Sequence, residues 1–152
     1  MQLYLVQHGE AVSEEVNPER PLSEKGISDV KKVATFLKQA GININTIFHS
    51  SKRRACQTAQ MLTKDLNPKC NILQREGLAP NDSIDGILRE ILERDEDLMI
   101  VGHLPFLAKL AGKLLLDSED KNIIEFKQGS VLLLSGSANN WKVKWFITPD
   151  LE

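Results

Sequence analysis

Residues 1–11 read MQLYLVQHGEA, and this stretch decides how the rest of the chain is interpreted. The apolar run Leu3–Val6 predicts a buried β-strand. A neutral glutamine, a histidine and a glycine follow it directly, as Gln7, His8 and Gly9. A histidine that ends a strand can be a ligand, a nucleophile or a packed core residue. The other segments of the chain must discriminate among these roles.

The composition is that of one globular domain over 152 residues. Hydrophobic residues make up 41% of the chain and charged residues 26%, which is ordinary for a globular protein. The net charge of −2 and the lack of a basic stripe predict no nucleic-acid partner. No apolar run approaches the ~20 residues needed to span a bilayer, so no membrane partner is expected. The strand pattern begins without a signal-peptide pattern, from which we expect a cytoplasmic protein.

Short apolar runs alternate with helix-length segments of 3.6-residue periodicity, which predicts a parallel sheet with helices on both faces. The predicted strands are Leu3–Val6, Thr46–Phe48, Asn71–Leu73, Leu98–Val101, Ser130–Leu134 and Trp141–Ile147. The sequence GSANN between the last two is typical of a hairpin turn. We therefore predict an α/β fold, a three-layer α/β/α sandwich whose mostly parallel central sheet ends in an antiparallel C-terminal hairpin. Partial alternation places the first strand, the last strand or both near a sheet edge.

Four helices are predicted from apolar faces and end signals. The first is capped by Ser23 and ended by Gly41, and its apolar face comprises Ile27, Val30, Val33, Ala34 and Leu37. The second starts at Ser50 or Ser51 and stops before Pro68. The face of the third comprises Ile84, Ile87, Leu88, Ile91 and Leu92. The fourth follows Pro105, which suits a first helical turn.

The chain has three histidines, and each closes an apolar run: His8, His49 and His103. In an open parallel sheet, the carboxyl ends of the strands line the ligand crevice. Any one of the three can be a packed core histidine. Three at strand ends favour a site built from at least two of them.

The segment HSSKRRACQTA, residues 49–59, places Lys52, Arg53 and Arg54 in the predicted first turn of the second helix. Cations there oppose the helix macrodipole, and a bound anion removes the conflict. Solvation explains the other basic side chains, but Arg54 precedes the small residue Ala55 on the inward face. We therefore predict that the Arg54 guanidinium holds an anion.

Two histidines and an arginine beside a helix N-terminus suit phosphoryl transfer onto an imidazole. A neutral imidazole nitrogen is nucleophilic near neutral pH, and cationic donors hold the phosphoryl oxygens. Gly9 lacks a Cβ, so we expect its backbone to approach the phosphoryl group and its amide to hold an oxygen.

The segments LVQHGEA, RPLSEKG, SSKRRACQTA and VGHLP occur in this order and resemble the motifs of the histidine phosphatase superfamily, whose fold is phosphoglycerate mutase-like. The short length and RPLSEKG resemble its smallest branch, the SixA-type phosphohistidine phosphatases. The resemblance implies one domain over residues 1–152 without a cap insertion. It also implies a metal-independent hydrolase that needs no cofactor and acts in signal transduction.

Carried over to this chain, the family's nucleophile falls on His8, its phosphate-holding arginine on Arg54 and its second histidine on His103. Further phosphate contacts fall on Gln7, Gly9 and Arg20. His49 matches no catalytic position of the family and is interpreted as structural.

Gln7 departs from the family pattern, which has an arginine before the histidine and glycine. Glutamine keeps an N–H donor but lacks the charge and the bidentate fork. Loss of one positioned donor typically lowers a rate by ~10²–10³. Three interpretations remain open. Arg20 or Arg53 supplies the missing charge, the enzyme is slow but adequate, or the chain binds phosphorylated ligands without turning them over.

The substrate is predicted from the segment QREGLAPNDS, residues 74–83, which is short and leaves the site open to a bulky substrate. It offers Glu76 and Asp82 as general acids, although surface roles fit both. A departing imidazole needs less protonation than an alkoxide. The predicted substrate is protein phosphohistidine. A metal site built on the three histidines is disfavoured because only Glu10 adds a carboxylate nearby.

Overall fold

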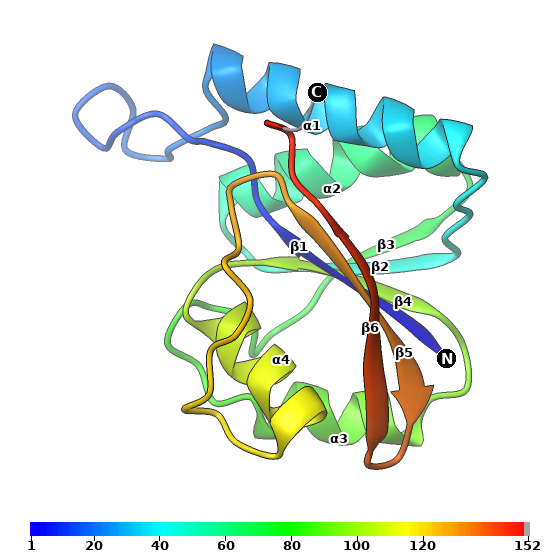
Figure 1. The fold of residues 1–152 in the computed structure, drawn as a ribbon. Helices are drawn as coiled ribbons and strands as arrows, with labels where there is room; N and C mark the ends of the chain where they lie inside the picture. The colour runs from blue at the N-terminus through cyan, green and yellow to red at the C-terminus, as the bar shows by residue number, and fades with distance from the viewer. Residues whose placement is uncertain (151–152) are drawn as a thin grey trace.

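The computed structural model describes residues 1–150, in which a six-stranded sheet lies between two pairs of helices (Figure 1). The strands are β1 (Gln2–Gln7), β2 (Thr46–His49), β3 (Asn71–Gln74), β4 (Leu98–Gly102), β5 (Val131–Ser137) and β6 (Asn140–Ile147). The helices are α1 (Glu24–Gln39), α2 (Arg53–Leu66), α3 (Asp85–Glu93) and α4 (Phe106–Leu116). The predicted α/β sandwich is confirmed.

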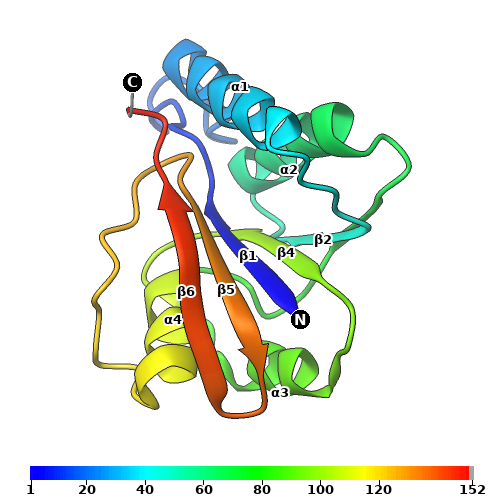
Figure 2. The ribbon, with the colours of Figure 1, turned by 45° about the vertical axis from the view of Figure 1, so that its right-hand side comes forward.

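The strand order in the sheet is β3-β2-β4-β1-β5-β6. The first four of these pair in parallel, and β5 runs antiparallel to both β1 and β6 (Figure 2). The predicted C-terminal hairpin is therefore confirmed. The prediction that the first strand, the last strand or both lie near an edge is met by β6, which is an edge strand. The strand β1 lies inside the sheet between β4 and β5, and its residues Leu3–Val6 are all buried.

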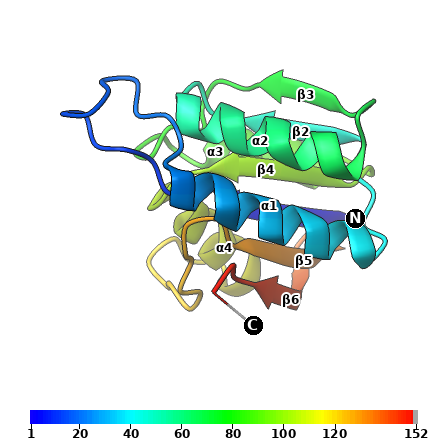
Figure 3. The same ribbon diagram turned by 90° about the horizontal axis from the view of Figure 1, so that it is seen from above.

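Alternate residues of the central strands pack into two separate cores. Leu3 and Leu5 of β1 join the core beneath α3 and α4, whereas Tyr4 and Val6 join the core beneath α1 and α2. Seen from above, α1 and α2 lie side by side over one face of the sheet (Figure 3). Because the central strands are covered on both faces, their sequences are continuous apolar runs.

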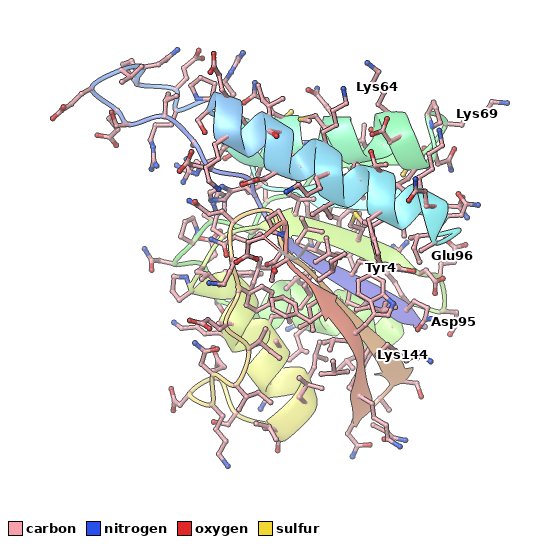
Figure 4. All side chains as sticks on the ribbon, turned by 45° about the horizontal axis from the view of Figure 1, so that its top comes forward. Tyr4, Lys64, Lys69, Asp95, Glu96 and Lys144 are labelled. Carbon is pink, nitrogen blue, oxygen red and sulfur yellow. The ribbon has the colours of Figure 1, made fainter. Side chains whose placement is uncertain are left out.

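The edge strand β6 carries charge where it meets solvent. Lys142 and Lys144 are exposed, and Figure 4 shows Lys144 on this strand. Lysines on an edge strand disfavour pairing with a further strand. Tyr4 reaches the same region from β1, with its ring centroid 6.1 Å from that of Trp145.

The helix ends agree with the sequence in part. Ser23 caps α1 by accepting from the Gly26 amide at 3.0 Å, and Gly41 follows the helix with a φ of 77°. Ile27 and Leu92 lie off the buried faces to which they were assigned, being 44% and 45% exposed. Each begins or ends the apolar pattern of its helix, where the 3.6-residue repeat turns it toward solvent.

The start of α2 differs from the prediction. The helix begins at Arg53 with Lys52 as its N-cap, and neither Ser50 nor Ser51 caps it through a side chain. The Ser50 hydroxyl instead lies against His103. Lys52 therefore lies just before the first turn of the helix, two residues after Ser50.

The segment between β1 and α1 projects from the sandwich as a loop (Figure 1). An isolated bridge between Ala11 and Leu22 closes its base, and the Val12 amide donates to the Pro21 carbonyl at 2.9 Å. This loop carries Arg20, whose Nε donates to the Val12 carbonyl. Across residues 1–150, the helices are too short or too polar to cross a lipid bilayer.

Candidate active site

The pairing of β1 with β4 brings two of the three histidines together. Gln7 is in register with Gly102, so the next residues, His8 and His103, leave the sheet side by side. Their ring centroids are 4.9 Å apart. The first turn of α2 adds Arg54, whose Nε atom is 3.4 Å from Nε2 of His8. The structure thus brings together the three residues assigned catalytic roles.

The His8 ring is held in one tautomer by its neighbour. Its Nδ1 atom lies 2.6 Å from the Gly9 carbonyl oxygen. A carbonyl oxygen only accepts hydrogen bonds, so Nδ1 carries the proton. In the neutral ring, Nε2 then keeps its lone pair, and this is the nitrogen that faces Arg54.

Burial lowers the pKa of His8 to about 4. The hydrogen bond to Gly9 acts in the opposite direction, while the charges of Arg54 and Arg20 lower the pKa further. The imidazole is therefore neutral at neutral pH. A neutral ring with a free Nε2 lone pair is the form of histidine that acts as a nucleophile.

His103 is neutral for the same reason. Burial lowers its pKa to about 3, and His8, Arg54, Lys52 and Arg20 add to the effect. A neutral ring can donate a hydrogen bond to a phosphoryl oxygen but adds no positive charge. Its Nε2 lies 2.6 Å from Ser50 Oγ, and its buried Nδ1 has no hydrogen-bond partner among the described residues.

Gly9 has a different role from the one predicted. Its amide donates to Thr58 Oγ1 at 3.1 Å and is therefore not free to hold a phosphoryl oxygen. A Cβ at this position would lie 2.8 Å from Cγ2 of Val30 and 3.1 Å from the Gly26 carbonyl. The glycine is required because the chain passes close to α1. The prediction that it admits a phosphoryl group is replaced by this packing reason.

Arg20 brings a second guanidinium to the site from the loop after β1. Its backbone is left-handed, with a φ of 49°, and its Nε donates to the Val12 carbonyl at 3.0 Å. Its charge lowers the pKa of His8, Arg54 and His103, so it acts on the whole cluster. A non-glycine residue in this conformation is uncommon and is often found at functional sites.

Besides Arg20, Arg53 is the cation predicted to replace the family arginine that is missing at Gln7. Arg53 is exposed at the start of α2 and is absent from the charges that shift the pKa of either histidine. Lys52, which the sequence interpretation left to solvent, does act on His103. Gln7 itself is half-buried, and its Oε1 has no hydrogen-bond partner within residues 1–150.

The two carboxylates considered as general acids lie in the turn after β3. Asp82 accepts a hydrogen bond from the Ala79 amide at 2.9 Å, and Glu76 is exposed. Neither is among the charges that shift the pKa of His8 or His103. Glu10, the carboxylate nearest to His8 in the sequence, accepts from the Ser23 hydroxyl at 2.7 Å.

The His49 ring makes its hydrogen bond to the backbone and not to His8, His103 or Arg54. It is buried at the end of β2, and its Nδ1 donates to the Ser50 carbonyl at 2.8 Å. Among residues 1–150, no three His, Cys, Asp or Glu side chains are grouped so as to hold a metal ion.

Two further residues of the segment SSKRRACQTA hold the site together, and their roles were not predicted from the sequence. Thr58 accepts from the Gly9 amide and donates to the Arg54 carbonyl at 2.8 Å, so it joins the end of β1 to α2. Gln57 accepts from the Leu22 amide at 2.7 Å and ties down the loop that carries Arg20. The signal for these roles was their place in the motif, three and four residues after Arg54.

A surface groove of about 600 Å³ lies elsewhere, between α1 and β6. Its walls include Phe36, Trp145 and Pro149, and none of the residues of the histidine cluster lines it. The groove is therefore separate from the histidine cluster.

Comparison with known proteins gives a family and a curated relative. The sequence profile of the histidine phosphatase superfamily (branch 1) matches residues 3–80, a range that contains His8, Arg20 and Arg54. An uncharacterized protein of Picosynechococcus is 35% identical over 147 residues, which cover 91% of this chain and 87% of that protein.

Solved structures show the same fold at low identity. The protein histidine phosphatase SixA complexed with tungstate has a TM-score of 0.87 and 21% identity, covering 98% of this chain and 97% of its own. The α-ribazole phosphatase of Shigella flexneri has a TM-score of 0.77 and 14% identity, covering 100% and 98%. Phosphoserine phosphatase of Entamoeba histolytica, in complex with 3-phosphoglyceric acid, has a TM-score of 0.71 and 18% identity, covering 95% of each chain.

Proposed function

The chain belongs to the histidine phosphatase superfamily, and we propose that it is a phosphatase that works through a phosphohistidine intermediate on His8. The observation that carries this proposal is the state of the His8 ring. Nδ1 is held by the Gly9 carbonyl, so Nε2 keeps a lone pair, and a guanidinium lies beside it.

In the first step, Nε2 of His8 attacks the phosphorus atom of the substrate. A nitrogen–phosphorus bond forms while the bond from phosphorus to the leaving group breaks, and the leaving group takes a proton from water. Arg54 and Arg20 offset the charge that spreads over the phosphoryl oxygens in the transition state. His103 contributes a hydrogen-bond donor.

In the second step, water attacks the phosphorus of the intermediate. The bond from phosphorus to Nε2 breaks, inorganic phosphate leaves, and the imidazole returns to its neutral form. The low pKa of the free His8 ring suits this cycle because the nucleophile is regenerated without a proton to remove.

Protein phosphohistidine is the substrate class that we propose. Neither carboxylate after β3 is among the charges that shift the pKa of the two histidines, so we assign no general acid for a leaving group that needs one. An imidazole leaving group is protonated near neutral pH and needs less help than an alkoxide. The fold alone does not decide this point, because it is shared with phosphatases named for small phosphate esters.

A second candidate function follows from Gln7. With a glutamine where the family has a charged fork, the cluster can hold a phosphorylated ligand without turning it over. Such a module would bind the phosphate through Arg54 and Arg20 and form no covalent bond to His8.

The two functions separate in one labelling experiment. A histidine-containing phosphotransfer domain, labelled with ³²P by phosphoramidate, is mixed with the protein and quenched under alkaline denaturing conditions. A phosphatase transfers label to the chain and releases inorganic phosphate, and His8→Ala abolishes both. Ser51→Ala, at an exposed position, is the control and should leave both unchanged. Binding without transfer of label would favour the second function.

A further inference from the structure

Ser50 stands between the end of β2 and the start of α2, directly against His103. Only 2% of its surface is exposed, and its amide donates to the Val101 carbonyl at 3.3 Å. The hydroxyl oxygen lies 2.6 Å from Nε2 of His103, which makes this the shortest link between α2's N-terminal segment and the histidine pair.

The direction of that hydrogen bond follows from the hydrogen atom that the Ser50 hydroxyl itself must place. The Lys52 amide donates to the same Ser50 Oγ at 3.3 Å, so the oxygen is already an acceptor. Its own hydrogen needs an acceptor, and His103 Nε2 is the partner that the described residues offer. The hydroxyl therefore donates to Nε2, and the proton of the neutral imidazole lies on Nδ1.

The Nδ1–H of His103 is then buried and has no partner within residues 1–150. Buried donors are nearly always paired, so a free one needs a reason. The centroids of the His103 and His8 rings are 4.9 Å apart. A phosphoryl group bound beside His8 would therefore bring oxygen acceptors close to His103.

We propose that Ser50 is a positioning residue, which fixes the Nδ1–H tautomer of His103 so that this ring donates to the transferring phosphoryl group. That the acceptor is a phosphoryl group rests on the proposed function, whereas the tautomer of His103 does not. Because burial and the surrounding cations keep His103 neutral, the choice of tautomer decides whether a donor is present. The Lys52 amide donates to the same hydroxyl oxygen and so helps to hold it beside His103.

The tautomer is measured directly from the ¹⁵N shifts of the His103 ring in the wild-type protein at pH 7. We expect a protonated Nδ1 and an unprotonated Nε2. In Ser50→Ala the Nε2–H form should appear, and kcat on the phosphohistidine substrate should fall about 10–100-fold while KM changes less than about twofold. A wrong tautomer in a fixed catalytic site costs up to ~10⁴, and here the donor acts beside two guanidinium groups.

Ser51→Ala is the matched control, because Ser51 is exposed and adjacent, and it should leave shifts and kcat unchanged. Ser50→Thr keeps the hydroxyl and should retain the Nδ1–H form. A wild-type ring protonated on Nε2 would overturn the proposal, even where Ser50→Ala fails to fold. So would a Ser50→Ala protein with unchanged tautomer and kcat. If the wild type releases no phosphate, the proposed function fails, and the ¹⁵N shifts still decide the role of Ser50.

Discussion

The Nε atom of Arg54 lies 3.4 Å from Nε2 of His8, so a guanidinium N–H faces the nitrogen assigned to attack phosphorus. This contact does two things at once. It places positive charge where phosphoryl oxygens would gather, and it lowers the pKa of the nucleophile. When a phosphate analogue binds, the Arg54 guanidinium can donate to its oxygens in place of Nε2, and the Nε2 lone pair is then free.

Arg54→Gln tests both effects. Turnover should fall by ~10²–10⁵, the range between loss of one positioned donor and loss of an arginine finger. The pKa of His8 should rise, because the charge of Arg54 no longer opposes protonation. Steady-state kinetics and an NMR titration of the ring measure the two quantities. Arg53→Gln removes an exposed neighbouring charge and should change neither, and equal effects of the two variants would contradict the assignment.

Gln7→Arg tests the departure from the family pattern. Restoring the charged fork should raise turnover at least tenfold on a small phosphorylated test substrate, since donors of this kind are worth ~10²–10³ where they act fully. Gln39→Arg, at the exposed end of α1, controls for an added surface charge. An unchanged or lower rate would indicate that Arg20 and Lys52 already supply the charge.

The fold was predictable because its signals are local and repeated. Each apolar run became a strand, and Ser23 and Gly41 ended α1 as expected. The position of β1 inside the sheet was not predictable. Strand order depends on which strands pair, and the alternation of polar and apolar residues along one strand does not record it. Residues at the ends of apolar patterns, such as Ile27, were also assigned to the wrong face.

The site was predictable as a set of residues but not as a network. Histidines at strand ends and an arginine in the first turn of a helix are visible in the sequence, so it predicts that His8, His103 and Arg54 lie together, as they do in the structure. The residues that hold them, Ser50 and Thr58, are short hydroxyl side chains whose roles depend on contacts distant in the sequence. Gly9 was misinterpreted for the same reason, since the atoms that exclude a Cβ belong to α1.

Acid should destabilise the protein through both histidines. The pKa of His8 is lowered to about 4 and that of His103 to about 3, so the unfolded chain binds more protons than the folded one below pH 6.5. Stability should therefore rise with pH between about 4 and 6.5, by at most about 1.4 kcal/mol per pH unit for each histidine. Urea unfolding at pH 7 and pH 5 measures the loss. His8→Asn should reduce the slope, and a wild-type stability that is flat over this range would contradict the burial of neutral rings.

Gly26 and Gly86 form a matched pair for the last prediction, because both are helical and only one is enclosed. A Cβ on Gly26 would lie 2.1 Å from the Glu10 carbonyl oxygen and 3.0 Å from the Glu10 nitrogen, whereas a Cβ on Gly86 would meet nothing within 4 Å. Gly26→Ala must therefore push the segment after His8 away from α1.

We expect Gly26→Ala to lower the free energy of unfolding by about 3 kcal/mol, the upper part of the usual cost of overpacking. Turnover should fall with it, since the displaced backbone carries His8. Gly86→Ala should raise stability by up to about 1 kcal/mol, because alanine loses less backbone entropy in a helix. Urea denaturation of both variants measures the difference. Equal effects would mean that the close approach of Glu10 to α1 does not hold the His8 segment in place.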